Sequence, residues 1–420
     1  MIDIKYLREH LDEVRANCAA RRAKVDLDAI LKVDTEYNVL LQEVEKIRAE
    51  RNEIANQSKG GKPSEELVEK GKKLKEQLAA KEVLLKELEV NRGLLLHTIP
   101  NLTHESVPDG DGDGDNKIIR QIGEPAKLAD PLDHVALSAK HELMDFERGA
   151  KVTGAKFYFL KNKLAILEQA VLRYGMDFMI REGYEFITTP DLAKEEVLIG
   201  KGFQPRGPEK QVYFVEDSDL ALVGTAEIPM LGYHMDESFE AEILPKKYVA
   251  FSHCFRTESG SYGRESYGLY RVHQFSKVEM FAFVMPDQSE AIHLEFLAME
   301  EKFWQSLGIP YQVVDCASGD LGASDYRRYD IEAWMWGRND GKGGYGEVTS
   351  ASNCIDYQAR GMNIKYKDKE GNKGFVHTLN GTVVAAPRAL ISILENYQQE
   401  DGSIKIPEVL VPYCGFDSIG

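Results

Sequence analysis

Charged and aromatic side chains alternate in the stretch FRTESGSYGRESYGLYRVHQFSKVEMF, which predicts two strands joined by a loop rich in Gly, Ser and Tyr. Successive side chains of a strand point to opposite faces. The first strand therefore presents Arg256 and Glu258 on one face, and the second presents Arg271, His273, Phe275, Lys277 and Glu279 on one face. A sheet face with such charges is costly to bury without a ligand. A solvated hairpin would carry the same pattern, so the stretch alone leaves both interpretations open.

Polar residues two positions apart recur at three further places. On a strand such residues point the same way, so several pairs can converge over one sheet face. A solvated strand explains any single pair equally well, but together with the stretch above the pairs predict a polar site. They are Thr225 with Glu227, Glu347 with Thr349, and Asn380 with Thr382.

A proline followed by an arginine opens a predicted helix near the C-terminus. Pro387 suits the first position of a helix, which places Arg388 in the first turn. A cation there opposes the helix dipole, and a bound anion would reverse the sign of that effect. The segment indicates an anion site, with a tolerated surface arginine as the alternative.

Several familiar motifs are missing from the sequence. The run GKGGYG at 341–346 matches G-x-G-x-x-G, but it precedes a predicted strand, whereas a dinucleotide site needs it between a strand and a helix. The five cysteines form no CxxC pair, and the ten histidines form no H-E-x-x-H site. Zinc, redox and dinucleotide chemistry are therefore unsupported.

Charge and composition limit the partners. The net charge of −17 argues against a general polyanion binder, but residues 1–100 carry equal numbers of acidic and basic side chains, so a nucleic acid would more readily meet this part. The N-terminus has no apolar signal segment, no apolar run approaches the roughly 20 residues of a membrane helix, and the cysteines are few and scattered. These features predict a cytoplasmic protein without membrane contact.

The N-terminal part of the chain has a heptad pattern. Apolar residues recur at alternating spacings of four and three over 33–54 and again over 67–88, with a predicted turn at 56–64. Two long helices joined by a short turn form an antiparallel hairpin. Its lysines and arginines fit a solvated coiled coil or a contact with a nucleic-acid backbone.

The sequence after the heptad region predicts an acidic connector over 98–133, and then short strands and a few helices. The strands often follow one another without an intervening helix, which favours antiparallel pairing. Helices are predicted at 162–182, 287–307 and 386–398. The predicted strands are 156–160, 184–190, 212–215, 248–258, 268–284, 311–315, 329–336, 345–352 and 374–382.

The segments that carry these pairs resemble a known family. FRTE with RVHQFSKVEMF resembles motif 2 of class II aminoacyl-tRNA synthetases, in the version found in seryl-tRNA synthetases. GYEFITTPDL resembles motif 1, and LNGTVVAAPRALISILENYQ resembles motif 3 with Arg388 as its arginine. GTAEIP and GEVTSASNCIDYQAR resemble the serine-loop and metal-binding segments. The resemblance covers essentially the whole chain in the right order.

The resemblance implies an α+β fold, in which an N-terminal antiparallel α-helical coiled-coil arm precedes a class II synthetase catalytic domain. In that domain a mainly antiparallel β-sheet is flanked by helices. It further implies a tRNA-binding arm at 1–100, a linker at 101–133, a catalytic domain at 134–420, and a homodimer.

It also implies a two-step reaction. ATP, with Mg²⁺ as cofactor, and L-serine would give seryl-adenylate and pyrophosphate, and the seryl group would pass to tRNA(Ser). Whether tRNA(Sec) is charged stays open, and no DNA partner is expected. Two alternatives are a synthetase-like ligase that activates another small amino acid and a non-catalytic tRNA-binding paralogue.

Residue roles come from the same resemblance. Arg256 and Arg388 are the implied catalytic residues. Arg256 would clamp the α-phosphate and the serine carboxylate, and Arg388 would lie on one face of adenine or near the γ-phosphate. Phe275 would stack on the other face of adenine, and Glu258 would accept from the adenine amino group. Glu347 and Ser350 would hold Mg²⁺. The full ATP-binding set is Arg256, Thr257, Glu258, Arg271, Val272, Phe275, Glu347, Val348, Thr349, Ser350 and Arg388. The serine-binding set is Thr225, Ala226, Glu227, Arg256, Glu279, Asn380 and Thr382.

The sequence departs from the family pattern near this predicted site. Gly381-Thr382-Val383 stands where bacterial members usually carry Gly-Ser-Gly, and Pro387 replaces a Gly before the motif 3 arginine. The segment KGFQPRGPEKQ at 201–211 replaces a stretch that commonly reads TGQLP. The change at Thr382 would affect selectivity for serine, and the change at 201–211 would affect the contacts of that loop.

Overall fold

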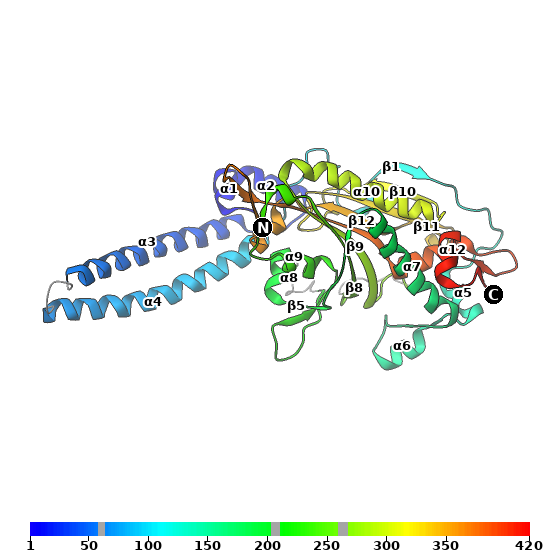
Figure 1. Cartoon of the computed structure of the whole chain (residues 1–420), viewed down its shortest axis with the longest axis horizontal. Helices are drawn as coiled ribbons and strands as arrows, with labels where there is room; N and C mark the ends of the chain where they lie inside the picture. Colours follow the sequence, from blue (N-terminus) through cyan, green and yellow to red (C-terminus); the bar gives the residue numbers. More distant parts are fainter. Residues whose placement is uncertain (58–63, 203–210, 259–267) are drawn as a thin grey trace. The chain divides into compact units, whose positions relative to one another are not determined.

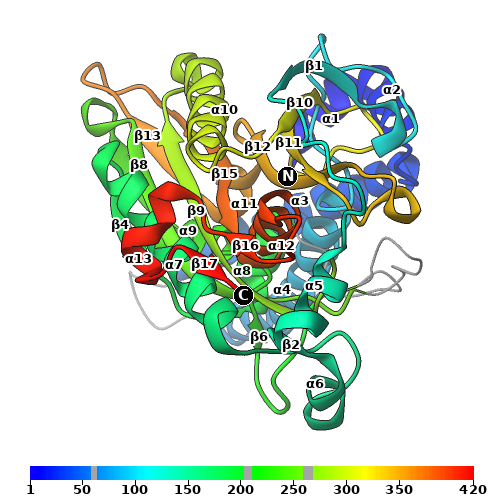
Figure 2. The ribbon, with the colours of Figure 1, turned by 90° about the vertical axis from the view of Figure 1, so that its right-hand side faces the viewer.

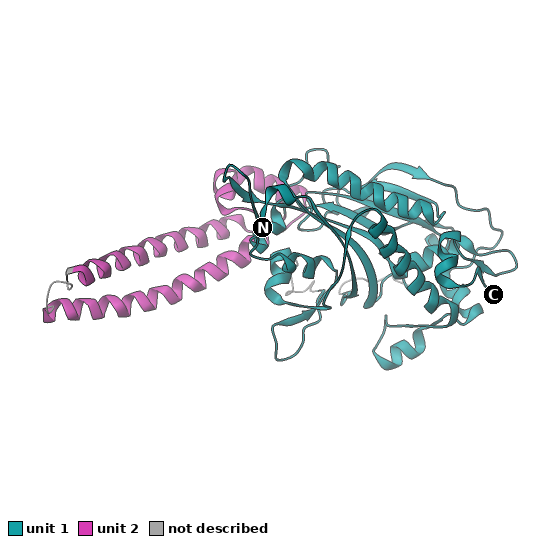
Figure 3. Cartoon of the chain, viewed as in Figure 1, with its two compact units in different colours: residues 1, 101–420 teal, residues 2–100 magenta. Residues whose placement is uncertain are grey.

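The computed structural model describes residues 1–57, 64–202, 211–258 and 268–420. It contains two compact units, one of residues 2–100 and one of Met1 with residues 101–420 (Figure 3). Most of the predicted turn at 56–64 and the loop between the two strands of motif 2 lie outside the described residues.

The smaller unit is helical. Two long helices run side by side as a hairpin (Figure 1), and Val44, Leu74 and Leu78 of the predicted heptads are buried in it. The predicted helical hairpin is confirmed. Its elements are α1 (Ile4–Glu9), α2 (Leu11–Ala20), α3 (Leu27–Gln57) and α4 (Glu65–Leu96).

Ion pairs cross between the two long helices. Arg48 lies 2.7 Å from Glu82, and Lys81 lies 2.6 Å from Glu43. These pairs are solvent-exposed, so each contributes little stability, but charges beside a heptad seam favour one pairing register over others.

An eight-stranded sheet forms the centre of the larger unit. Neighbouring strands are antiparallel except for the last pair, in which β4 runs parallel to β8. The predicted mainly antiparallel sheet is confirmed. In spatial order the strands are β1 (Lys117–Ile122), β10 (Tyr311–Asp315), β11 (Arg327–Met335), β12 (Gly344–Asn353), β15 (His377–Ala385), β9 (Gln274–Val284), β8 (Lys246–Phe255) and β4 (Glu185–Thr188).

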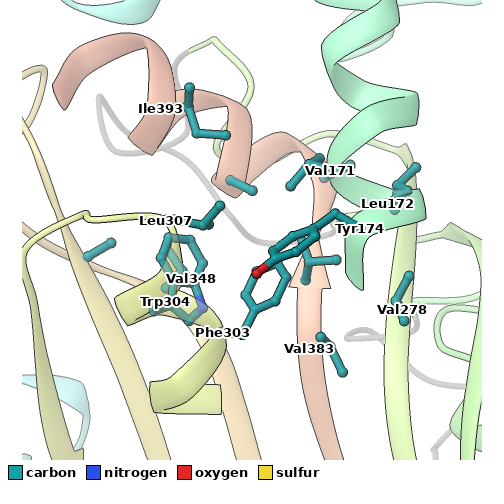
Figure 4. Close-up of a cluster of buried hydrophobic side chains, with 14 of the residues drawn as sticks. Val171, Leu172, Tyr174, Val278, Phe303, Trp304, Leu307, Val348, Val383 and Ile393 are labelled. Carbon is teal, nitrogen blue, oxygen red and sulfur yellow. The ribbon is translucent and has the colours of Figure 1, made fainter. Parts of the chain in front are cut away.

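The three predicted helices are present as α7 (Asn162–Arg181), α10 (Ser289–Ser306) and α12 (Ala386–Tyr397), and they pack against the sheet. In Figure 2, α12 and α13 (Val411–Cys414) lie beside α7 in front of the central strands. Tyr174 of α7, Phe303 and Trp304 of α10, and Ile393 of α12 meet in one hydrophobic cluster with sheet residues (Figure 4).

Strand β9 separates two hydrophobic clusters. Its residues Met280 and Ala282 pack into the cluster of Figure 4, whereas Phe281 and Phe283 pack into a second cluster with short helices on the other face. Alternation along the strand therefore places Glu279 on the second face. These short helices are α8 (Glu195–Lys201), α9 (Glu227–Tyr233) and α11 (Tyr357–Met362).

The remaining elements are short and lie around this framework. They are α5 (His134–His141), β2 (Met144–Asp145), α6 (Phe146–Val152), β3 (Phe159–Leu160), β5 (Leu192–Lys194), β6 (Leu220–Leu222), β7 (Ser238–Glu240), β13 (Lys365–Lys367), β14 (Lys373–Phe375), β16 (Ile404–Lys405) and β17 (Ser418–Ile419).

The structure corrects the sequence-based predictions for two segments that contain none of the predicted site residues. The connector predicted over 98–133 contains β1, which pairs with β10 as an edge of the main sheet. The segment KIIRQI follows an acidic run and has apolar residues at only three of its six positions, so its strand was missed. Arg120 of this strand forms an ion pair with Glu301 of α10. The strand predicted at 212–215 is reduced to a single bridge between Phe214 and Ala221.

Candidate active site

A cavity of about 380 Å³ in the larger unit is lined by residues of β9, β11, β12 and β15 and of segments next to the strands. Most of the predicted ATP-binding residues line it, and Thr382 of the predicted serine set joins them. The predicted lining residues are Arg256, Glu258, Arg271, Val272, Phe275, Glu347, Val348, Thr349, Ser350, Thr382 and Arg388.

Arg256 enters the cavity just beyond the end of β8. Its Nε donates to the Gly224 carbonyl at 3.2 Å, and its guanidinium lies 5.4 Å from the centre of the Phe275 ring. Strand β8 ends at Phe255 and β9 begins at Gln274. Placing Arg256 and Glu258 on one strand, and Arg271 on the other, was therefore wrong, although all three reach the cavity.

Glu258 adopts a left-handed backbone with φ of 47° and turns toward Arg271. The Arg271 Nη1 lies 3.5 Å from a Glu258 carboxylate oxygen. A non-glycine residue in this region is uncommon and costs conformational energy. The turn places the carboxylate beside the cavity, where it can accept a hydrogen bond from a ligand.

Arg388 lies in the first turn of α12, as predicted, and its guanidinium contacts Glu347 at the cavity. Its Nη1 lies 3.0 Å from Glu347 Oε1. Burial acts to raise the pKa of Glu347, but the positive charges of Arg388 and Arg328 outweigh it and hold that pKa below its usual value. Glu347 is therefore an anion that balances Arg388 until a more negative ligand competes for the arginine.

Tyr270 lines this cavity, contacts two arginines through its ring, and was not predicted. Arg388 lies 4.8 Å and Arg338 5.1 Å from the centre of its ring. Its hydroxyl donates to the Glu347 carbonyl at 3.2 Å. Cation–π stacking of this kind fixes the guanidinium planes while leaving their N–H groups available.

Glu279 is the acceptor of a buried polar cluster beside the cavity. Its two oxygens lie 2.8 and 2.9 Å from Thr225 Oγ1, and the Ala226 amide donates to it at 2.7 Å. Lys277 donates to the same carboxylate at 2.5 Å. Thr382 lies opposite Glu279 in the pairing of β15 with β9. The structure thus brings Thr225, Ala226, Glu279 and Thr382 together.

Glu227 forms a second buried cluster. Asn380 Nδ2 donates to its Oε1 at 2.8 Å, Gln358 Nε2 donates to the same oxygen at 2.5 Å, and Lys201 Nζ lies 3.0 Å from its Oε2. Glu227 is the first residue of α9, so its placement with Thr225 on a strand was wrong. Helix geometry nevertheless brings it to Asn380, as the convergence argument required.

Comparisons with known proteins cover the whole chain. The family model "tRNA synthetase class II core domain (G, H, P, S and T)" matches residues 213–397, and "Seryl-tRNA synthetase N-terminal domain" matches residues 1–103. A serine–tRNA ligase of Treponema denticola is 48% identical over 100% of both chains. One of Dictyoglomus thermophilum is 49% identical over 100% of this chain and 99% of its own.

The chain belongs to the seryl-tRNA synthetase family. Two solved members of that family share its fold. One, from Pyrococcus horikoshii in complex with ATP, has a TM-score of 0.86 and 38% identity, covering 100% of this chain and 99% of its own. The other, a cytoplasmic enzyme of Naegleria fowleri with AMP, has a TM-score of 0.83 and 32% identity, covering 100% and 98%. The predicted family, fold class and ligase activity are confirmed.

Not every residue predicted from the seryl-tRNA synthetase resemblance lines the cavity. Thr257 does not, and its backbone amide donates to the Gln211 carbonyl at 3.3 Å. Thr349 does, but its hydroxyl donates to the buried Glu300 at 2.9 Å, so its side chain supports the sheet. Among the described helices, none is both long and apolar enough to cross a membrane.

Arg328 is a further cavity residue of this synthetase that the sequence did not reveal. Its guanidinium donates to Asp320 at 2.6 Å, to Asp330 at 3.0 Å and to the Cys316 sulfur at 3.3 Å. Among the described residues these three are close enough together to suggest a metal site. Arg328 already supplies the positive charge, so the cluster is an ion-pair network.

Proposed function

We propose that the chain joins L-serine to tRNA(Ser) in two steps through seryl-adenylate, at the cavity described above. The observation that carries this proposal is the meeting of Arg256 and Arg388 in one cavity with Phe275 and Glu347. Two arginines from separate elements suit a polyphosphate, an aromatic ring suits a base, and a carboxylate suits a cation held by phosphates.

In the first step the serine carboxylate attacks the α-phosphorus of ATP, and pyrophosphate leaves. Arg256 binds the carboxylate and the α-phosphate, which holds the reacting atoms together and offsets their negative charge. Arg388 takes the γ-phosphate end or the second face of adenine, Phe275 stacks on adenine, and Glu258 accepts from its amino group. Because serine already presents an ionised carboxylate, this step needs no general base.

Mg²⁺ fits the oxygen donors of Glu347 and Ser350. Glu347 is ionised and half-buried at the cavity, and Ser350 contributes a hydroxyl to the same lining. A hard cation prefers such oxygens. When bound, the ion would neutralise charge on the phosphates. ATP itself is a ligand of the related Pyrococcus horikoshii enzyme.

Serine recognition falls to the two buried clusters beside the cavity. Thr225, Ala226 and Glu279 form one, and Glu227 with Asn380 forms the other. Their acceptors suit the ammonium and hydroxyl of serine. Thr382, which lines the cavity opposite Glu279, limits the space for the side chain and keeps a hydroxyl available.

The arm and the assembly complete the proposal. The helical unit of residues 2–100 binds tRNA(Ser), and tRNA(Sec) is a further substrate to test because its charging would use the same arm. The enzyme works as a homodimer in the cytoplasm. The five cysteines are all buried with free thiols, which suits a reducing compartment.

Serine-dependent ATP–pyrophosphate exchange tests this proposal. Exchange should be strong with serine and weak with alanine, threonine and glycine. A preference for one of the other three would favour a ligase for another small amino acid. Exchange with none of them would favour a non-catalytic tRNA-binding paralogue.

A further inference from the structure

A buried histidine–glutamate pair lies behind the cavity and has no part in the reaction described above. Glu395 of α12 is 0% exposed and His134 at the start of α5 is 6% exposed. Glu395 Oε1 lies 2.7 Å from His134 Nδ1 and accepts from the His134 backbone amide at 2.9 Å. Its Oε2 accepts from the Gly337 amide at 2.8 Å.

The second ring nitrogen of His134 reaches the segment that borders the cavity. The Leu269 amide donates to His134 Nε2 at 3.2 Å. Because a backbone amide can only donate, Nε2 must be the unprotonated nitrogen, and Nδ1 must carry the proton given to Glu395. Glu395 therefore selects the tautomer that can accept from Leu269.

Gly268, the residue before Leu269, lies against this imidazole. Gly268 has φ of 63°, and a Cβ there would stand 2.1 Å from His134 Nε2. Only glycine allows both the backbone angle and this close approach. The next residues, Leu269, Tyr270 and Arg271, all line the cavity.

Glu395 also acts on a second segment, through its hydrogen bond with the Gly337 amide. The following residue is Arg338, which stacks on Tyr270. Tyr270 in turn contacts Arg388 and donates to the Glu347 carbonyl. One buried carboxylate thus holds Leu269 through His134, holds Arg338 through Gly337, and belongs to the helix that carries Arg388.

We propose that His134 is a positioning residue for ATP, acting through the Leu269 amide on Tyr270 and through Tyr270 on Arg388. This inference rests on the proposed binding of ATP in the cavity. The contacts described for His134 are with Glu395 and Leu269, and neither belongs to the two serine clusters. A change at His134 should therefore weaken the binding of ATP and leave the binding of serine unchanged.

Two substitutions separate the acceptor at Nε2 from the donor at Nδ1. His134→Asn can still donate to Glu395 but cannot reach Leu269, whereas His134→Gln reaches the position of Nε2 with an acceptor. In serine-dependent exchange, His134→Asn should raise the KM for ATP about tenfold, as expected for one buried amide left unpaired. The KM for serine should change less than twofold, and His134→Gln should recover most of the loss.

The matched control is His141→Asn at the other end of α5, where the ring pairs with the Gly402 carbonyl at 2.7 Å. It should leave both KM values unchanged. Nucleotide binding without serine, measured by calorimetry on the full chain, should show the same ranking of variants. Circular dichroism and thermal melting would exclude a general loss of fold. If His134→Asn does not fold, the test is the ATP affinity of His134→Gln, which should stay close to that of the wild type.

The inference is overturned if folded His134→Asn binds ATP normally, if both KM values rise together, or if His134→Gln has no better ATP affinity than His134→Asn. Arg388→Ala distinguishes this from failure of the proposed function. If Arg388→Ala raises the KM for ATP and His134→Asn does not, only the positioning role is wrong. If neither does, the cavity is not the ATP site.

Discussion

Lys201 holds its ammonium 3.0 Å from the Glu227 carboxylate, and the two side chains are only 17% and 7% exposed. Burial alone would lower the pKa of Lys201, but the charge of Glu227 outweighs it and the pKa is raised. The lysine belongs to the segment at 201–211 that departs from the common family pattern. A lysine of this segment therefore provides the positive charge that pairs with a carboxylate of the proposed serine site.

Removing that cation should destabilise the enzyme. Lys201→Met leaves Glu227 buried without a positive partner, and breaking a buried pair costs about 3–5 kcal/mol. Urea unfolding would measure this loss. The double variant Lys201→Met with Glu227→Gln should lose clearly less than the sum of the single changes, because it leaves no unpaired charge. Additive losses would show that the two residues do not act as a pair. Lys201→Arg is the control and should stay near the wild type.

Arg256→Ala should lower the rate of serine-dependent exchange by about 10²–10³-fold, because it removes the donors proposed for the α-phosphate. Size-exclusion chromatography should show an unchanged oligomeric state. Arg173→Ala, which breaks a surface pair with Asp177 on α7, is the control for loss of an arginine and should exchange normally. Near-normal exchange by Arg256→Ala would refute its proposed role.

Deletion of residues 35–90 should separate the two steps. These residues lie within the helical unit, so serine-dependent exchange should survive, whereas charging of tRNA(Ser) should fall severely. Both assays need the same stated salt concentration, since contacts to phosphates weaken steeply as salt rises. Charging at wild-type efficiency would mean that the arm has no role in binding tRNA.

His293 should make stability depend on pH. Burial lowers the pKa of this histidine, although its hydrogen bond to the Ala351 carbonyl at 2.9 Å acts the other way. In the unfolded chain it takes up a proton near pH 6.5, so stability is full above that pH and falls as the pH drops toward the folded pKa. His293→Gln can keep the hydrogen bond without titrating. Its unfolding free energy should vary less between pH 6.5 and 5, by up to about 1.4 kcal/mol per pH unit. Equal slopes in the two proteins would contradict this.

The alternation of side chains along a strand predicted which residues share a face, because this depends only on neighbouring positions in the sequence. Alternation along one strand put Phe275, Lys277 and Glu279 on the same face, and in the structure Lys277 donates to Glu279. It could not find Lys201 or Gln358, because each reaches Glu227 from a different short helix, far away in the sequence. Thr225 and Glu227 were paired for the wrong reason. They do not lie on a strand, because β6 ends at Leu222 and α9 begins at Glu227.

Arg328 and Tyr270 escaped prediction because their roles depend on neighbours that only the folded sheet assembles. Arg328 is indistinguishable in sequence from the adjacent Arg327, which instead pairs with Asp315. Which of the two arginines reaches the cavity depends on the face of β11 on which each lies and on the acidic loop beside that strand. Neither feature has a sequence motif.

The order of strands in the sheet also sets the order in which the chain can fold during synthesis. Helices α3 and α4 contact each other across a short stretch of sequence, so they can pair soon after leaving the ribosome. Strand β1 emerges next, but its partner β10 is made only after most of the remaining strands and helices. Until β10 is made, KIIRQI has no partner strand, and an unpaired strand edge of this kind can pair wrongly with another nascent chain.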